Sequence, residues 1–263
     1  MIVNARMYSA TPQAKAAWKR VLAWVLKKAA LEWQLLDYDA PAPLSELWAR
    51  DDLGCAMMCG LPYSQRRPRP RLAAAPVPSP ARYGGRPIYF TDIVVRSDSK
   101  YAKLEDTFGG IVGYTLEDSM SGYVALRKHL LPFRTTTKPK LYSAAVGGLL
   151  NARRVIEALA ERRIDVGPLD SYYHDLIRHH EPDFAAKVRV IATTAPAPIP
   201  PLVSTSGDNV SELREALLAA GEAPELAGDR HVLLLDRFAV PDDADYRIFD
   251  TYLSEARQYP DLW

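Results

Sequence analysis

The sequence contains little cysteine, no long hydrophobic run and no excess of charge of either sign. The two cysteines, Cys55 and Cys59, are too few ligands for a zinc site, and we expect buried thiols rather than a disulfide. The best candidate for a membrane span, residues 16–30, falls short of the roughly 20 apolar residues required and is interrupted by lysines and arginines. The 33 basic residues are balanced by 32 acidic ones, which gives no support to a polybasic surface for nucleic acid or an anionic membrane.

Motifs of several catalytic classes are also missing. The sequence has no nucleophile elbow, no P-loop and no dinucleotide-binding glycine pattern, since its glycine pairs at 84–85 and 109–110 stand alone. His174, His179 and His180 suggest a metal site by number only, because adjacent positions on a helix do not share a face; we expect a solvated helix end there. We therefore expect no catalytic residues, no cofactor and no metal.

The 263 residues do contain a regular alternation of short strand-like and helix-like segments, and 48% of them are hydrophobic, enough for a sizeable core. Thr11 and Pro12 indicate a helix start, with Thr as N-cap and Pro in the first turn. Strands are expected at 3–7, 34–38, 54–59, 71–77, 88–96, 110–115, 141–146, 164–167, 188–193 and 232–238. Further helices are expected at 44–50, 121–130, 151–161, 170–179 and 244–257, and one that ends near 220. This alternation favours an α/β fold with helix-covered, mostly parallel sheets.

The pattern starts again near Ile88 and returns through a proline-dense extended segment near Thr194. This predicts two α/β lobes joined by two crossings, with residues 1–92 and 194–263 in lobe I and residues 93–193 in lobe II. Two lobes joined in this way can close about a hinge and trap a ligand. The alternative is one large doubly wound domain with long loops.

Residues 117–123 place two serines and a glycine where a helix begins after a strand. The first amides of a helix have no partner within it and carry partial positive charge. Ser119 and Ser121 add hydroxyl groups, and Gly122 lets the backbone come close to a ligand, so this segment predicts an anion-binding turn. An ordinary helix N-cap is the alternative, because Ser and Asp are favoured at that position anyway.

Several short motifs occur in an order typical of one family. They are Met7-Tyr8, Cys59-Gly60-Leu61-Pro62-Tyr63, Thr107-Phe108-Gly109-Gly110, Asp118-Ser119-Met120-Ser121-Gly122-Tyr123, residues 163–172, and residues 194–196 with 199–200. Together they resemble the phosphate, phosphite and phosphonate substrate-binding proteins of ABC importers, over roughly residues 3–203. The resemblance implies a type II periplasmic-binding-protein fold whose two hinge crossings lie where the alternation restarts and returns.

The resemblance also implies a ligand site in the cleft between the lobes. The residues that would hold the anionic head of the ligand are Ser119, Met120, Ser121, Gly122 and Tyr123. The facing lobe would contribute Tyr8, Cys59, Gly60 and Tyr63. Tyr8 packed over a strand end is the alternative for that residue.

Two further residues are implied to face this cleft, Asp170 and Tyr172. Asp170 could pair with a ligand amine, as in an aminoalkyl phosphonate, or accept the hydrogen of a protonated oxyanion. Helix capping explains Asp170 equally well, because it follows a strand and begins a helix. Tyr172 either lines the cleft or covers it.

These observations predict the solute-binding component of an ABC importer, which binds a small phosphonate- or phosphate-like oxyanion and passes it to a membrane permease. We expect a monomer with no nucleic-acid partner, periplasmic if a leader has been removed and otherwise cytoplasmic, because residues 1–7 lack the features of a secretory signal. The alternative is a cytoplasmic enzyme of the same fold that acts on a small carboxylate, with Asp118, Asp165 or Asp170 as its acid–base group. A regulatory ligand-sensing module ranks last, because no helix-turn-helix signal supports it.

Overall fold

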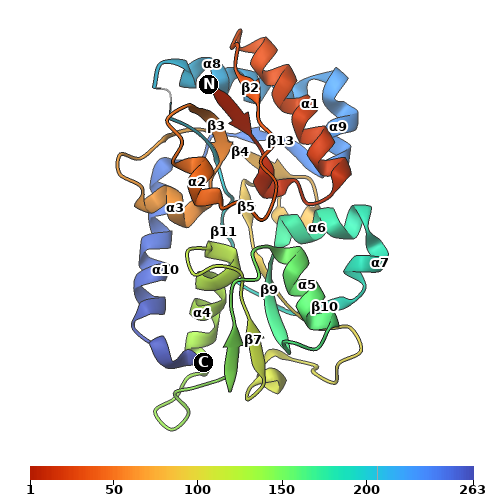
Figure 1. Ribbon diagram of the computed structural model, residues 1–263, viewed down its shortest axis with the longest axis vertical. Helices are drawn as coiled ribbons and strands as arrows, with labels where there is room; N and C mark the ends of the chain where they lie inside the picture. The colour runs from red at the N-terminus through yellow and green to blue at the C-terminus, as the bar shows by residue number, and fades with distance from the viewer. Residues whose placement is uncertain (206) are drawn as a thin grey trace. The chain divides into compact units, whose positions relative to one another are not determined.

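The computed structural model describes residues 1–205 and 207–263, apart from the side chain at position 208. The chain divides into two units, each built around its own sheet (Figure 1). Unit 1 consists of Met1–Ile88 and Pro198–Tyr246, and unit 2 of Tyr89–Ala197 and Arg247–Trp263.

Unit 1 contains a mixed sheet. In spatial order its strands are β13 (Leu235–Ala239), β4 (Arg71–Pro78), β12 (Leu202–Ser204), β3 (Leu53–Met57), β1 (Ile2–Asn4) and β2 (Gln34–Leu35). β1 pairs parallel with β2 and β3, whereas β12 pairs antiparallel with β3 and β4, and β13 antiparallel with β4. β3 is buried along its whole length, which makes it a central strand of the unit.

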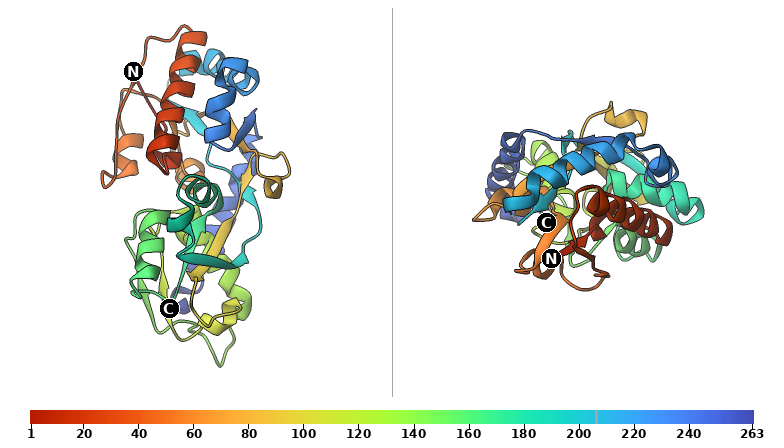
Figure 2. Two further views of the ribbon diagram at one scale, coloured as in Figure 1. Left: turned by 90° about the vertical axis from the view of Figure 1, so that its right-hand side faces the viewer. Right: turned by 90° about the horizontal axis from the view of Figure 1, so that it is seen from above.

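The longest helix of unit 1 begins where Thr11 and Pro12 predict it. In α1 (Pro12–Lys28) the Thr11 hydroxyl accepts a hydrogen bond from the Ala14 amide at 3.2 Å. α1 packs beside α8 (Val210–Glu222) and α9 (Ala227–Val232), as Figure 2 shows. The buried stripe of α1 consists of Ala14, Ala17, Trp18, Val21, Leu22, Val25 and Leu26. This spacing of three and four residues is the helical period, so the sequence itself determines which face of α1 is buried. The shorter helices of this unit are α2 (Leu44–Trp48) and α3 (Gly60–Gln65).

Unit 2 contains a second mixed sheet. Its order is β10 (Val188–Thr193), β6 (Thr91–Arg96), β9 (Val166–Asp170), β7 (Ile111–Gly113) and β8 (Ala144–Val146). β7 pairs parallel with β8 and β9, and β6 pairs antiparallel with β9 and β10. Its helices are α4 (Ala125–Leu130), α5 (Ala152–Ala160), α6 (Ser171–His180), α7 (Pro182–Ala185) and α10 (Ile248–Arg257).

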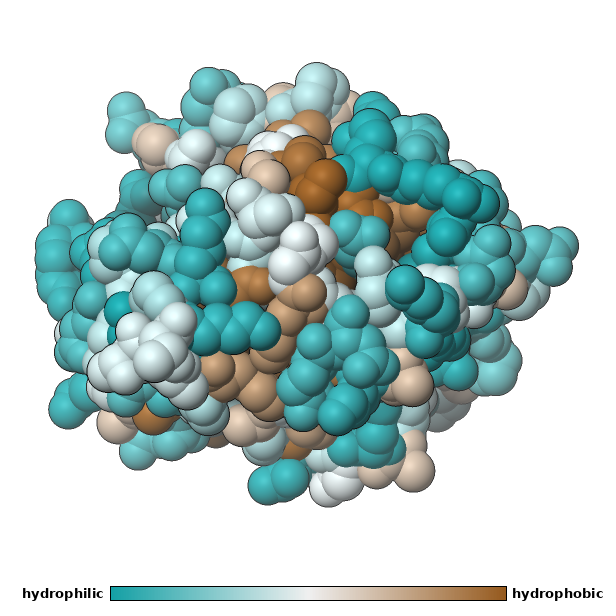
Figure 3. All heavy atoms as spheres, turned by 90° about the horizontal axis from the view of Figure 1, so that it is seen from below, coloured by the Kyte–Doolittle hydropathy of each residue, from teal (hydrophilic) through white to brown (hydrophobic). Residues whose placement is uncertain are grey.

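The core of unit 2 joins its sheet to α4. The fully or almost fully buried members of this core are Ile93, Val95, Leu104, Val112, Leu126, Leu130, Leu141, Tyr142, Val166 and Leu262. Apolar residues at its margin, such as Phe133 and Ile191, are only partly covered. Figure 3, seen from the end where Figure 1 draws β7, shows apolar residues reaching the surface between hydrophilic ones.

Two short strands and several single helical turns complete the described part of the chain. β5 (Ile88–Tyr89) and β11 (Ala197–Pro198) form a two-stranded sheet, and the division between the units falls within both strands. The turns are η1 (Arg6–Tyr8), η2 (Ala81–Tyr83), η3 (Leu104–Thr107), η4 (Met120–Val124), η5 (Leu131–Phe133), η6 (Gly207–Asn209), η7 (Pro224–Leu226), η8 (Asp243–Arg247) and η9 (Pro260–Leu262). Of these, η4 is a π-helix.

The structure corrects two expectations about this architecture. Residues 247–263, expected in lobe I, belong to unit 2, because α10 packs against α4 and Leu262 is buried in the unit 2 core. The sheets are mixed rather than mostly parallel. Strands such as β1 and β2, which α1 connects within one unit, pair parallel. β6 and β12 each follow a segment in which the chain passes from one unit to the other, and they pair antiparallel with β9 and β4.

Two other expectations, the free thiols and the α/β fold, are confirmed. Cys55 and Cys59 are free, buried thiols, and burial raises the pKa of the Cys55 thiol to about 12, so it stays protonated at neutral pH. The short strands and helices of both units agree with an α/β fold. Within the described residues, no helix combines the length and the apolar character needed to cross a bilayer.

Candidate functional site

The predicted anion-binding turn is a π-helical turn at the start of α4. Residues 119–123, called the anion turn below, comprise Ser119 as N-cap and the first residues of η4, which continues directly into α4. The Ser119 hydroxyl oxygen accepts a hydrogen bond from the Gly122 amide at 3.0 Å. The expected N-cap is therefore present, and the amides at the start of this helical segment carry the partial positive charge that favours an anion.

Gly122 is required for the shape of this turn. A Cβ atom built on Gly122 would lie 1.7 Å from the Thr115 Oγ1 atom and 2.9 Å from the Ser119 Oγ atom. The Thr115 amide also donates to the Gly122 carbonyl oxygen at 3.1 Å. The backbone of the turn thus rests directly against Thr115, so the glycine is explained by close approach rather than by an unusual backbone angle.

Asp170 lies beside the anion turn. It ends β9 and caps α6, where its Oδ1 atom accepts from the amides of Tyr172 and Tyr173 at 3.0 and 3.1 Å. Its other oxygen, Oδ2, accepts from the Ser121 hydroxyl at 3.5 Å. Asp170 is therefore both the helix cap and a carboxylate in contact with the anion turn, and the two expectations for this residue are compatible.

A threonine that the sequence did not single out supports the same turn. Thr91, at the start of β6, is buried, and its hydroxyl donates to the Ser121 carbonyl oxygen at 3.0 Å. The Thr91 amide in turn donates to the Thr194 hydroxyl oxygen at 3.0 Å. Thr91 and Thr194 are 30 and 73 residues from Ser121 in sequence, so no local motif could have linked them to this turn.

The aromatic residues expected at the site are held by packing. The Tyr123 ring lies 4.8 Å from the Tyr114 ring and 5.6 Å from the Trp263 ring, and the Arg127 guanidinium lies over both Tyr123 and Trp263. Tyr172 is fully buried, and burial raises the pKa of its phenol well above the ordinary value. Complete burial favours the interpretation that Tyr172 covers the expected cleft rather than lining it.

Four expected site residues belong to unit 1: Tyr8, Cys59, Gly60 and Tyr63. Cys59 is the N-cap of α3 and Gly60 is its first residue, and both are buried. The Tyr63 ring packs edge to face against Tyr246 at 5.1 Å, and its hydroxyl donates to Asp243. Burial and this hydrogen bond raise the pKa of the Tyr63 phenol. Tyr63 thus has a structural partner within its own unit.

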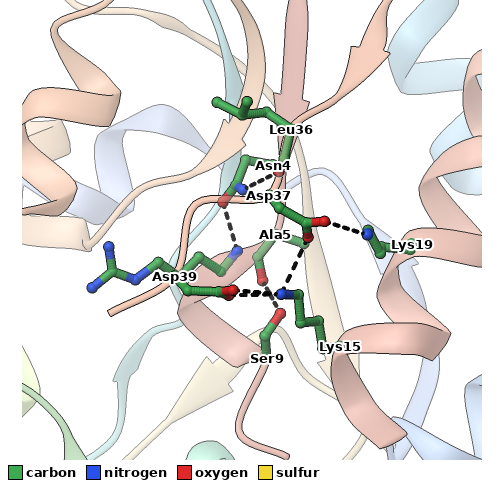
Figure 4. Close-up of polar contacts among 9 residues, drawn as sticks. Asn4, Ala5, Ser9, Lys15, Lys19, Leu36, Asp37 and Asp39 are labelled. Carbon is green, nitrogen blue, oxygen red and sulfur yellow. Dashed lines mark hydrogen bonds and ion pairs between the residues drawn. The ribbon is translucent and has the colours of Figure 1, made fainter. Parts of the chain in front are cut away.

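Tyr8, the fourth of these residues, ends η1 and is 1% exposed. Figure 4 shows the polar contacts that surround η1: the Asn4 side chain donates to the Leu36 carbonyl oxygen at 2.7 Å, and Lys15 lies between Asp37 and Asp39. The hydrogen bond to Asp39 raises the pKa of Lys15, and that from Lys19 lowers the pKa of Asp37. The cavity among these groups is about 20 Å³, which leaves room for little more than a water molecule. We therefore interpret these polar contacts as bracing the ends of β1 and β2 rather than as a ligand site.

The histidine-rich helix is solvated at its end as expected, where His179 is exposed and His180 half-buried, but His174 is not part of that solvated end. His174 is buried in unit 2, and its Nδ1 atom lies 2.9 Å from Oδ2 of the fully buried Asp92. Among the residues that the structure describes, no group of three or more His, Cys, Asp or Glu side chains could hold a metal ion. Asp165, an acid–base candidate of the enzyme alternative, accepts from the Ile111 amide at 2.7 Å and the Tyr101 hydroxyl at 3.1 Å, so it braces β7.

Comparisons with known proteins point to one family. Residues 8–246 match the family model described as "ABC transporter, phosphonate, periplasmic substrate-binding protein". No curated protein matches the chain in sequence. The chain is similar in fold to a binding protein component of a phosphonate ABC transporter from Pseudomonas aeruginosa, with 19% identity, coverage of 97% of this chain and 87% of that one, and a TM-score of 0.78.

Two other solved structures show what proteins of this fold bind. PhnD1 from Prochlorococcus marinus, solved in complex with methylphosphonate, is 12% identical, with 98% of each chain covered and a TM-score of 0.77. A protein from Xanthomonas citri, solved with bound ATP, is 20% identical, with 98% of each chain covered and a TM-score of 0.66. These likenesses confirm the expected type II periplasmic-binding-protein fold.

Proposed function

The chain belongs to the family of periplasmic substrate-binding proteins of phosphonate ABC transporters, and from this premise we propose that its anion turn binds a small phosphorus oxyanion. As a substrate-binding component of an importer it is not an enzyme, and the comparisons give the enzyme alternative no support. Its partners are a small ligand and the permease of the transporter. We further propose that the protein is periplasmic, as its family is, and monomeric.

The observation that carries this proposal is the geometry of the anion turn. Ser119 caps η4, Ser121 presents a hydroxyl group, and Gly122 keeps the backbone free of a Cβ atom that Thr115 would exclude. Helix-start amides and hydroxyl donors suit the oxygens of a tetrahedral anion. The ligands of the two solved relatives, methylphosphonate and ATP, both carry phosphorus oxyanions, which supports the same chemical class here.

Asp170 restricts which anions the turn can bind. Its Oδ2 atom is 3.5 Å from the Ser121 hydroxyl, so an anion bound by Ser121 meets a carboxylate. Two like charges at such a distance disfavour each other unless one is protonated or a cation lies between them. We therefore propose a ligand that carries either a proton on its oxyanion or a nearby ammonium group, such as 2-aminoethylphosphonate.

Calorimetry with named ligands tests this function. We would titrate the protein with methylphosphonate, phosphate, phosphite and 2-aminoethylphosphonate, and with methanesulfonate and acetate for comparison. A phosphorus oxyanion should bind, and Ser121→Ala should weaken it about tenfold, because a hydrogen bond to a charged group is lost. Ser143→Ala is the matched control, since its hydroxyl donates to the Gly110 carbonyl oxygen away from the turn. Equal affinities for the two variants would refute the role of the anion turn.

A further inference from the structure

Unit 2 contains a cavity of about 420 Å³ whose lining comes from that unit alone. Its walls are formed by α4, by α10 beside it (Figure 1), and by residues 89–91 and 194–197. This volume lies within the range of small-molecule sites in proteins. Ser121 and Asp170, which belong to the proposed oxyanion site, are not among its lining residues.

The lining of this cavity is largely apolar and aromatic. Its principal side chains are Tyr89, Phe90, Met120, Pro132, Phe133 and Tyr252. Aromatic walls offer a flat apolar molecule both stacked and edge-to-face contacts. The same walls would strip the water from an anion without replacing its hydrogen bonds, which excludes the oxyanion of the transporter as the occupant.

Most polar groups of the lining already have partners within unit 2. The Thr91 hydroxyl donates to the Ser121 carbonyl oxygen at 3.0 Å, and the Thr194 hydroxyl donates to the Ala195 carbonyl oxygen at 3.1 Å. Lys128 forms an ion pair with Glu255, and its ammonium lies 4.6 Å from the centre of the Tyr252 ring. These groups therefore have little hydrogen-bonding capacity left for a ligand.

The imidazole of His129 differs from the threonine and lysine groups of the lining. It lies in the lining and contacts the Phe133 ring at 6.4 Å, and within the described part of the chain it has no hydrogen bond or ion pair. Burial lowers the pKa of this imidazole, so it is neutral at pH 7 and offers one donor and one acceptor. The cavity thus combines broad aromatic contact with a small number of polar groups, of which the His129 imidazole is one.

We propose that this cavity binds an uncharged aromatic molecule of one or two rings that carries a single hydroxyl or amino group, hydrogen-bonded to His129. The site is distinct from the anion turn, although Met120 belongs to both. Because Thr91 and Met120 contact the cavity while Thr91 also supports Ser121, an occupant would rest against the back of the anion turn.

The test uses 2-naphthol as the probe and isothermal calorimetry on the full chain. 2-Naphthol should bind and 2-naphthoate, which has the same rings and a charge, should not. Ala125→Phe should weaken 2-naphthol about tenfold or more, because Ala125 lines the cavity and the added ring occupies it. Ala160→Phe, on another helix of unit 2 and away from the cavity, is the matched control and should leave binding unchanged.

His129→Leu provides a second variant, whose outcome does not depend on how Ala125→Phe folds. It should weaken 2-naphthol several-fold and leave naphthalene, which has no hydroxyl, unaffected. Binding of 2-naphthol to Ser121→Ala, and in the presence of saturating methylphosphonate, should persist. No binding by the unmodified protein, equal binding by the two Phe variants, or competition with methylphosphonate would each overturn the proposal of a separate site.

Discussion

The Ser121 hydroxyl donates to Asp170 Oδ2 across 3.5 Å, so the hydroxyl proposed for the ligand already has an acceptor within the protein. A ligand oxygen that takes this hydrogen bond must compete with a carboxylate. The same carboxylate caps α6 through its other oxygen and is therefore held in place when a ligand arrives.

Asp170→Asn should change which ligand is preferred. Asn is as good an N-cap as Asp, so α6 should keep its start, while the negative charge beside Ser121 is lost. We expect dianionic phosphate at mildly alkaline pH to bind about tenfold tighter and 2-aminoethylphosphonate about tenfold weaker. Calorimetry on both ligands measures this. Asp118→Asn removes the same charge from an exposed position in the preceding loop and should alter neither affinity. A parallel change in both ligands would contradict the role of Asp170 in selection.

Gly122→Ala should destabilise unit 2 and abolish oxyanion binding. The added Cβ would collide with Thr115 and Ser119, and such overpacking costs about 1–3 kcal/mol of unfolding free energy. Thermal and urea unfolding measure this cost. Thr115→Ala in the same chain should recover part of it by removing the atom that lies 1.7 Å from the new Cβ.

Gly228→Ala is the matched control for that experiment. Gly228 lies within α9, is exposed, and would bring its new Cβ within 4 Å of no other atom. Replacement by Ala should therefore stabilise the protein by about 0.5–1 kcal/mol. Equal effects at the two glycines would show that close approach does not explain Gly122.

Two substitutions one turn apart on α1 should have very different costs. Trp18 is 0% exposed and packs edge to face with Phe238, so Trp18→Ala should cost about 3–5 kcal/mol of unfolding free energy. Lys15 forms its ion pairs with partly exposed partners, so Lys15→Met should cost about 1 kcal/mol or less. Urea unfolding of both variants measures the two losses of unfolding free energy. A large cost at Lys15 would mean that the contacts around η1 do more than brace strand ends.

His129 should make stability depend on pH just below neutrality. Burial lowers its pKa from about 6.5, so the unfolded chain binds more protons than the folded one between the lowered value and about 6.5. The free energy of unfolding should therefore fall as the pH drops from about 7 to about 5.5. Urea titrations at both pH values measure the change, and His129→Leu should reduce it. An equal pH dependence in the variant would assign the effect to other groups.

Local signals in the sequence determine much of the fold. Thr11 and Pro12 mark the start of α1, Asn151 caps α5 through a hydrogen bond from the Arg154 amide, and the spacing of apolar residues selects the buried face of α1. No helix was expected at 60–65, where the structure has α3. Its six residues carry too little periodicity for a short helix to be recognised from sequence.

Residue patterns predicted the site where its residues are neighbours in sequence, and the family resemblance added Asp170, 49 residues from Ser121. Ser119, Ser121 and Gly122 form one motif, whereas Thr91 supports them from β6 and Thr115 from the bend after β7. The burial of Met120 and Tyr172 follows from tertiary packing. The same limit applies to residues 247–263, whose helix was expected but whose unit was not. Closure about a hinge stays a prediction.

The assignment of residues 247–263 to unit 2 also constrains the order in which the chain can fold. Leu262 is 0% exposed within a core whose other members lie between Ile93 and Val166, so this core stays incomplete until nearly the last residue of the sequence has been synthesised. The sheet of unit 1 likewise stays incomplete until β12 and β13 have been synthesised. Domains normally fold as they emerge from the ribosome, but neither unit here is contiguous in sequence. A nascent chain of this kind can complete neither core before its later segments, β12 and β13 for unit 1 and Leu262 for unit 2, have been synthesised.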